Sequence, residues 1–373
     1  MLATLLALAG CYDDGLDAPY PGEYPEGETD INVRMDFEPF ASNSVNTRGT
    51  AGDKMDNLDD LCVVAYDTEG NLLDGFPVEI TKSDHGLNVV KVPRKDSDAS
   101  NGASAQSSTY QATFKMTVPY GRYYIYGVAN LGHYTGDTRT TTTYQELTSG
   151  GRFAEAAKTR EGLLNCQTEW DEKNYLNNCE MLGYFTNDLN EKSPSTGNDT
   201  NNKTVSIDRP GMTVHSWLRR CASKVTIDFD GSGLRENIYV YIKRATIHDI
   251  PRHCALGMPN GIGSEAEMIS YKNDQYRPDS DNKGVYIDYG TGSDYRNWPS
   301  ISKGHPNLTD ASDEPRDFHS ETAEALYLYE NRQGDQGDDF NKEQIPDKDG
   351  NIIGKDDMKD EVPYGSYIEV EAY

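Results

Sequence analysis

Runs in which apolar and polar residues alternate recur along the chain and predict β-strands. In the segment 31–37, the side chains of Ile31, Val33, Met35 and Phe37 take every second position, so an extended chain places them on one face. Such a face is what a strand needs if it is to fill the groove of a β-sandwich. Further predicted strands lie at 225–229, 238–242, 325–329 and 367–372.

Two pairs of apolar segments are separated by turn residues and predict hairpins. The run 61–66 is almost entirely apolar, which is typical of a buried strand, and a turn at 67–71 leads from it into Leu72 and Leu73. The second pair consists of 112–118 and 123–131, joined by the turn residues 119–121.

Polar segments divide the chain between these strands. The stretch 187–203 is rich in Asn and Asp and is the candidate for a loop or a domain junction, and we place the domain boundary near residue 203. The stretch 259–322 is too polar for a regular core and predicts a long connection within the second domain. Between 149 and 189, the spacing of apolar residues predicts a short helical excursion.

The length and composition agree with two all-β domains. At roughly 150 residues per domain, 373 residues suggest two, which we place at 31–203 and 204–373. The 34 Gly and 17 Pro imply frequent turns, and 25 Tyr supply apolar surface that a disordered acidic chain would lack. The formal net charge of −27 repels phosphate backbones, so we expect no nucleic-acid partner. The sequence ends within the last predicted strand, so we expect the second domain to be incomplete.

The first residues resemble the end of a bacterial lipoprotein signal. An apolar run leads into the sequence Leu-Ala-Gly-Cys at 8–11, which resembles a lipobox, and cleavage there leaves Cys11 as the lipid-bearing first residue. We assign 1–11 to a signal remnant whose start lies upstream, and the acidic, Pro-rich segment 12–30 to a flexible tether. The alternative is a short buried helix that ends at Cys11.

Several motifs, taken in their order along the chain, resemble those of Bacteroidetes fimbrillins, the type V pilins, and of a less characterised branch of fimbrillin-like lipoproteins. The resemblance covers roughly residues 8–373 and is spread over both halves. The motifs are the lipobox, Asn46-Thr47-Arg48-Gly49-Thr50, the strand 61–66, Val118-Pro119-Tyr120-Gly121 with 126–130, and the segments 217–225, 329–334 and 364–370.

This resemblance implies two transthyretin-like antiparallel β-sandwich domains with long polar insertions. It also implies a lipid anchor in the outer membrane, exposure at the cell surface and assembly with other fimbrial subunits. In pilin members, an Arg-specific protease removes the first strand, and the open groove receives a strand from the next subunit. Arg48, followed by Gly49, matches the cleavage position. Anchor and some accessory members keep the strand, so both fates stay open for 31–37.

The sequence predicts neither a catalytic site nor a metal or cofactor site. None of the common catalytic or phosphate-binding motifs occurs in it. His248, His253 and Cys254 lie close together, but a proline separates them and a fourth ligand is missing. The run 347–351 resembles part of a calcium loop, yet Ile345 stands where the first acidic ligand is needed. Turn formation is sufficient to explain that run.

The cysteine positions suggest one candidate disulfide. If Cys11 carries lipid, five of the six cysteines remain, so at least one is a thiol. Cys166 and Cys179 flank a polar stretch and are the candidate pair, because an exported chain permits disulfides. Cys62 stands in a buried strand and is expected to act as a small apolar side chain.

The expected function is a structural or adhesive subunit of a fimbria, as stalk, tip or anchor, with other subunits and host or bacterial surface ligands as partners. A rival from another class is a surface glycan-binding lipoprotein, for which Trp170 and Trp298 in polar segments are candidate platforms. An enzyme is the least favoured class, because the sequence offers no acid/base or nucleophile set.

Overall fold

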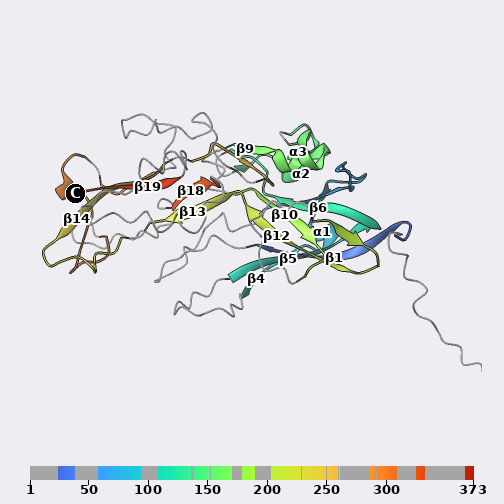
Figure 1. The fold of residues 1–373 in the computed structure, drawn as a ribbon, viewed down its shortest axis with the longest axis horizontal. Helices are drawn as coiled ribbons and strands as arrows, with labels where there is room; N and C mark the ends of the chain where they lie inside the picture. The colour runs from blue at the N-terminus through green and yellow to red at the C-terminus, as the bar shows by residue number, and fades with distance from the viewer. Residues whose placement is uncertain are drawn as a thin grey trace, which may run out of the picture.

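The structure of the protein is a computed structural model in which strands predominate over helices (Figure 1). The α-helices have four to six residues each, so the predicted β class with a short helical excursion is confirmed. These helices are α1 (Lys82–His85), α2 (Thr143–Thr148) and α3 (Arg160–Asn165), with 3₁₀ turns η2 (Ala156–Lys158) and η6 (Tyr295–Asn297). The described residues are 24–37, 58–93, 108–135, 138–151, 153–169, 179–189, 203–227, 229–248, 250–258, 260, 286–290, 292–308, 325–331 and 366–373.

Nine strands form one mixed sheet, in the order β3-β2-β6-β10-β12-β1-β5-β4, with β11 paired to β6. β1 runs parallel to β12, and the other recorded pairs in this sheet are antiparallel. The strands are β1 (Glu28–Phe37), β2 (Leu61–Tyr66), β3 (Val78–Glu79), β4 (Asn88–Pro93), β5 (Ser108–Pro119), β6 (Gly121–Ala129), β10 (Met181–Thr186), β11 (Val205–Ile207) and β12 (Thr213–Arg220).

The sheet curls so that its two halves share one apolar core. Apolar side chains from β2, β6 and β10 pack together with those from β12, β1 and β5. Gly127 of β6 shows how close the halves come, because a Cβ atom at this position would collide with Cε of Met35 on β1. β1 and β6 are not neighbours in the sheet, so this contact crosses the core. The strand predicted at 31–37 is therefore confirmed as a core strand, and it begins at Glu28, inside the predicted tether.

One of the two predicted hairpins is wrong. Tyr66 bridges to Leu72 across the turn after β2, as expected. β5 and β6 are also consecutive, but they do not pair with each other: β5 pairs with β1 and β4, whereas β6 pairs with β2, β10 and β11. The physical reason is that β1 pairs along β5 over ten residues and takes the edge that a hairpin would use.

The polar stretch 187–203, expected to separate two domains, connects two strands of the same sheet. It follows β10 and precedes β11, and β12 then lies between β10 and β1. The sheet therefore continues to Arg220, beyond the predicted boundary. The local polar composition could not show this, because turns within a sheet use the same residue types as linkers do.

The outer face of β2 and β6 is covered by a second core. Leu147 of α2 and Leu163 and Leu164 of α3 pack there, and the hydroxyl of Tyr66 donates to the carbonyl oxygen of Ala157 at 2.8 Å. Two small strand pairs contribute to this core: β9 (Gln167–Glu169) with β15 (His253–Ala255), and β13 (Ala222–Thr226) with β18 (Ala325–Tyr329). A further short pair is β7 (Tyr134–Thr135) with β8 (Thr138–Arg139).

A four-stranded sheet lies at the end of the molecule's long axis opposite β1 (Figure 1). Its long strand β14 carries Ile242, Ala245 and Ile247 into a small third core. No helix in the described ranges is long and apolar enough to span a membrane. The strands of this sheet are β14 (Tyr239–His248), β16 (Tyr286–Asp288), β17 (Ser300–Ser302) and β19 (Tyr367–Ala372).

Candidate functional site

The first strand of the described residues, β1, occupies a slot inside the large sheet. β1 pairs in parallel with β12 on one side and antiparallel with β5 on the other. The slot, defined here as the space between β12 and β5, is therefore filled by a segment from the start of the described chain, between strands that come much later in sequence. Removing this segment would leave two strands without a partner on one edge each.

One face of β1 is apolar and fully covered. Ile31, Val33, Met35 and Phe37 are each at most 2% exposed. The ring of Phe37 also stacks on that of Tyr110, with 5.4 Å between the ring centres. Burial of one such side chain stabilises a fold by about 1.5–3 kcal/mol. The apolar face thus supplies much of the stabilisation that holds β1 in the slot.

The other face of β1 carries a buried carboxylate. Oδ2 of Asp36 lies 2.9 Å from Nε2 of His215 on β12. Arg34, two positions earlier on the same strand, donates to this oxygen from Nη2 at 2.6 Å and from Nε at 3.1 Å. Oδ1 accepts from Nε2 of Gln111 on β5 at 3.0 Å. Asp36 therefore connects both neighbours of β1.

These contacts keep Asp36 ionised. Burial alone would raise the pKa of this carboxyl, but the hydrogen bonds from His215, Arg34 and Gln111 outweigh burial and hold its pKa at about 2, below the ordinary 3.8. An ionised carboxylate can only accept hydrogen bonds, so Nε2 of His215 must carry the proton. His215 itself is fully buried.

The start of β1 is fixed by exposed contacts of a different kind. Asp30 accepts a hydrogen bond from the hydroxyl of Thr117 on β5 at 2.7 Å. The backbone N–H of Asn32 donates to the carbonyl oxygen of Met212 at 2.8 Å, and its side-chain amide donates to that of Gly211 at 2.9 Å. Exposed hydrogen bonds are worth less than buried ones. The strand is thus held most firmly at its Asp36 end.

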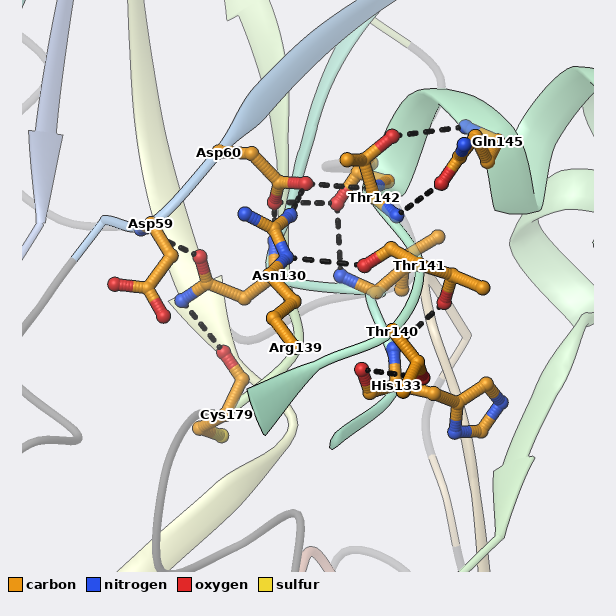
Figure 2. Close-up of polar contacts among 12 residues, drawn as sticks. Asp59, Asp60, Asn130, His133, Arg139, Thr140, Thr141, Thr142, Gln145 and Cys179 are labelled. Carbon is orange, nitrogen blue, oxygen red and sulfur yellow. Dashed lines mark hydrogen bonds and ion pairs between the residues drawn. The ribbon is translucent and has the colours of Figure 1, made fainter. Parts of the chain in front are cut away.

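A second polar cluster lies at the start of β2 and is shown in Figure 2. The carboxylate of Asp60 forms an ion pair with Arg139. It also accepts from the backbone N–H of Asn130 at 3.0 Å, and from the backbone N–H and the hydroxyl of Thr143 at 2.6 Å each. Nε of Arg139 donates to the carbonyl oxygen of Thr141 at 3.0 Å. Asp60 therefore holds the segment between β6 and α2 against the start of β2.

Asn130 completes this cluster. It has a positive φ of 62°, a conformation that asparagine tolerates better than most residues. Its side chain accepts from the N–H of Asp59 at 3.0 Å and donates to the carbonyl oxygen of Cys179 at 3.1 Å (Figure 2). The polar side chains of this cluster thus bond to one another and to backbone groups. We call the cluster a structural clamp, because it fixes the segment between β6 and α2 to the start of β2.

The described residues contain no group of three or more His, Cys, Asp or Glu side chains that could hold a metal ion. Of the candidates weighed in the sequence, Cys254 is fully buried in the second core, where its thiol donates to the carbonyl oxygen of Cys221 at 3.6 Å. The calcium-like run 347–351 lies outside the described residues.

The residues of the proposed maturation pathway lie outside the described part of the chain. This applies to the lipid site Cys11 and to the cleavage site Arg48 and Gly49. Cys166 and Cys179 are described, and both are thiols in the structure. Cys179 is fully buried and Cys166 is half-buried. A bridge between them stays a prediction.

The two tryptophans considered as glycan platforms do not form one in the described structure. Trp170 lies outside the described residues, and Trp298 is only 8% exposed. Aromatic rings do gather elsewhere: Tyr373 stacks on Tyr295 at 3.9 Å between ring centres, and Tyr241 meets Tyr295 edge to face at 5.3 Å. Tyr373 is 70% exposed. Sequence reasoning missed this group, because its members come from separate segments.

Comparison with known proteins finds no matching family model and no matching curated protein. Among solved structures, a fimbrial assembly protein from Parabacteroides distasonis matches with 10% identity and a TM-score of 0.38, covering 77% of this chain and 86% of that chain. The tip fimbrial protein Mfa3 from Porphyromonas gingivalis, with C-terminal truncation, matches with 14% identity and a TM-score of 0.35, covering 92% of this chain and 98% of that chain. The chain thus has structural matches, at low identity, to fimbrial proteins of Bacteroidales.

Proposed function

We propose that this chain is a structural or adhesive subunit of a cell-surface fimbria that assembles by exchange of β-strands. The observation that carries the proposal is the position of β1, which fills a slot between β12 and β5 and precedes the segment that contains Arg48. Cleavage after Arg48 frees β1 from the rest of the chain. The emptied slot then receives a strand of another subunit.

The slot has the properties that such an exchange needs. Loss of β1 leaves unpaired backbone N–H and C=O groups on β12 and β5, and these groups pair readily with an added strand. It also uncovers the core positions of Ile31, Val33, Met35 and Phe37. Burial of four such side chains stabilises the fold by roughly 6–12 kcal/mol in total. An empty slot is therefore unstable, and a filled slot is strongly favoured.

The remaining parts of the proposal concern export and architecture. Cys11 carries the lipid that tethers the protein to the outer membrane. The acidic segment after Cys11 acts as the signal for export to the cell surface. The chain folds as two transthyretin-like sandwiches, of which the large curled sheet belongs to the first. The proposed function of this chain includes no catalytic step. If β1 is retained, the same fold serves as an anchor or accessory subunit.

Limited digestion tests the proposal. The full-length protein is treated with an Arg-specific protease, and its oligomers are followed by native gel and size-exclusion chromatography. We expect cleavage after Arg48 and a ladder of oligomers. Arg48→Ala should stay monomeric, and Arg235→Ala, which changes an exposed arginine in the loop before β14, should behave as the wild type does. Cleavage after Arg48 without any oligomer, even with partner subunits present, contradicts the proposal.

A second candidate function is binding of surface glycans. Tyr295 and Tyr373 stack on each other, and Tyr239 on β14 is exposed. These residues present aromatic rings at the four-stranded sheet formed by β14, β16, β17 and β19. Aromatic side chains combine apolar faces with polar edges, and this combination suits sugar rings. A glycan array with the wild type and with Tyr373→Ala decides this candidate: binding that the substitution abolishes supports it, and no binding rejects it.

A further inference from the structure

We propose that the strand accepted into the β1 slot must carry a carboxylate at the position of Asp36. The inference rests on the strand exchange proposed above and specifies the chemistry of the partner strand. The occupant is an extended polypeptide segment with apolar residues at alternate positions and one Asp or Glu between the last two of them.

The groups that stay behind when β1 leaves require this carboxylate. His215 belongs to β12 and Gln111 to β5, so both remain in the slot, whereas Arg34 departs with β1. His215 is fully buried, and its Nδ1 has no hydrogen-bond partner among the described residues. The bond from Nε2 to Asp36, at 2.9 Å, is the hydrogen bond that the structure records for this ring. An occupant without an acceptor here leaves a buried donor unpaired.

An anionic acceptor fits better than a neutral one. The same carboxylate takes one bond from His215 and one from Gln111 at 3.0 Å through its two oxygens. An asparagine offers a single acceptor oxygen, and its amide group presents further donors to groups that already donate. Bonds to a charged acceptor are also roughly twice as strong as neutral ones. The slot therefore selects an acid over the amide of the same shape.

Backbone pairing fixes where the acid must stand. Asp36 is opposite Trp217 on β12 and Gln111 on β5. Its neighbours Met35 and Phe37 point into the core. A shift by one residue would turn the acid into the core, and a shift by two would move it away from Gln111, which is opposite Asp36 on β5. The carboxylate thus sets the register as well as the identity of the strand.

A peptide competition on the full chain tests this inference. A site for a sequence-specific protease is placed beside Arg48, the chain is cut, unfolded in urea and refolded with an excess of two mass-labelled peptides of residues 26–39. Native mass spectrometry then counts which peptide fills the slot. We expect the wild-type peptide to outcompete Asp36→Asn by about 10- to 100-fold, because one buried donor loses its partner.

The control peptide carries Asp30→Asn and has the same net charge as Asp36→Asn. Asp30 is exposed at the start of β1, so this peptide should compete within about threefold of the wild type. In a chain that carries His215→Leu, the wild-type peptide and the Asp36→Asn peptide should fill the slot to nearly the same extent. Equal uptake of the wild-type and Asp36→Asn peptides overturns the carboxylate requirement alone. Exclusion of every peptide, including the wild type, overturns the strand exchange and the requirement together.

Discussion

The carboxylate of Asp36 and Nε2 of His215 lie 2.9 Å apart in the interior of the protein and belong to strands 179 positions apart in the chain. This polar contact holds β1 on one face of the strand, and apolar contacts hold it on the other face. Since the two residues are on parallel neighbours, their contact ties the first strand to β12 independently of the hydrogen bonds of the sheet. Its strength depends on the charge of Asp36.

The first prediction concerns pH and Asp36. The pKa of this carboxyl is about 2 in the folded protein, below the ordinary 3.8. A lowered folded pKa stabilises the fold above about pH 4, and the contribution is lost as the pH falls from about 4 to about 2. Asp36→Asn should therefore lower the free energy of unfolding by about 2 kcal/mol at pH 7 and by less at pH 3. Urea unfolding at both pH values measures the difference.

Asp294→Asn is the matched control for this experiment. Asp294 also pairs with an arginine, Arg296 at 2.8 Å, but it is exposed to solvent. Exposed ion pairs contribute little to stability, so the control should stay close to the wild type at both pH values. A loss for Asp36→Asn that is the same at pH 3 and pH 7 would show that its charge is not the cause.

The second prediction concerns the clamp around Asp60. Arg139→Met removes the partner of a carboxylate whose side chain is only 8% exposed. Breaking such a pair costs about 3 kcal/mol, because one charge is left without compensation. Hydrogen exchange should also accelerate at the backbone amide of Thr143, which donates to Asp60.

Glu155→Gln serves as the control for the clamp, because Glu155 and Lys158 form an exposed ion pair at 2.7 Å. It should change the free energy of unfolding by less than about 0.5 kcal/mol. Equal effects of the two substitutions, or unchanged exchange at Thr143, would mean that the ion pair between Arg139 and Asp60 does not hold the segment in place.

Local patterns in the sequence predict some of the strands, whereas β10, β16 and β17 lie in stretches for which the pattern predicts a helical excursion or a polar connection. The alternation of Ile31, Val33, Met35 and Phe37 identifies β1 as a strand with one apolar face, because side-chain direction in a strand depends only on position along it. The run Leu61–Tyr66 is likewise a strand, with every residue buried. For β1 and β2, the sequence alone therefore indicates that the segment is extended, and for β1 it also indicates which face is apolar.

Pairing between distant segments could not be predicted in the same way. Nothing near Asp36 indicates that it meets His215, and nothing near Asp60 indicates Arg139. The β5 and β6 segments look like a hairpin, yet β1 comes between β12 and β5 and changes the order of the sheet. One local signal does exist: an acid within a strand that has an apolar face marks a position where a partner is needed, since a buried charge is costly without one.

The third prediction concerns the thiols. Among the five cysteines described, Cys166 is the half-buried one, whereas the other four are buried. Burial raises the pKa of Cys179 to about 12 and also raises that of Cys62, so little reactive thiolate forms there. Iodoacetamide should therefore modify Cys166 first in the native protein, as measured by peptide mass spectrometry. Labelling of all five at similar rates would contradict the buried arrangement.

The same labelling experiment tests the bridge between Cys166 and Cys179. After treatment with oxidised glutathione, Cys166 should lose its reactivity and regain it on reduction, and a linked peptide with Cys179 should appear. Cys166→Ser controls for the assignment, because it removes the half-buried partner and leaves Cys179 buried. A glutathione adduct on Cys166 without the linked peptide would exclude the bridge under these conditions.

The last prediction compares Ile247 on β14 with Ile368 on β19, which stand directly opposite each other. Opposed residues of antiparallel strands point to the same face, yet Ile247 is 2% exposed and Ile368 is 48% exposed. Ile247→Ala should cost about 3 kcal/mol, because it leaves a cavity in the small core. Ile368→Ala should cost about 1 kcal/mol or less, because much of its surface is already in water. Urea unfolding of the two variants gives both values. Equal losses would show that another segment or subunit covers the face of β19 in solution.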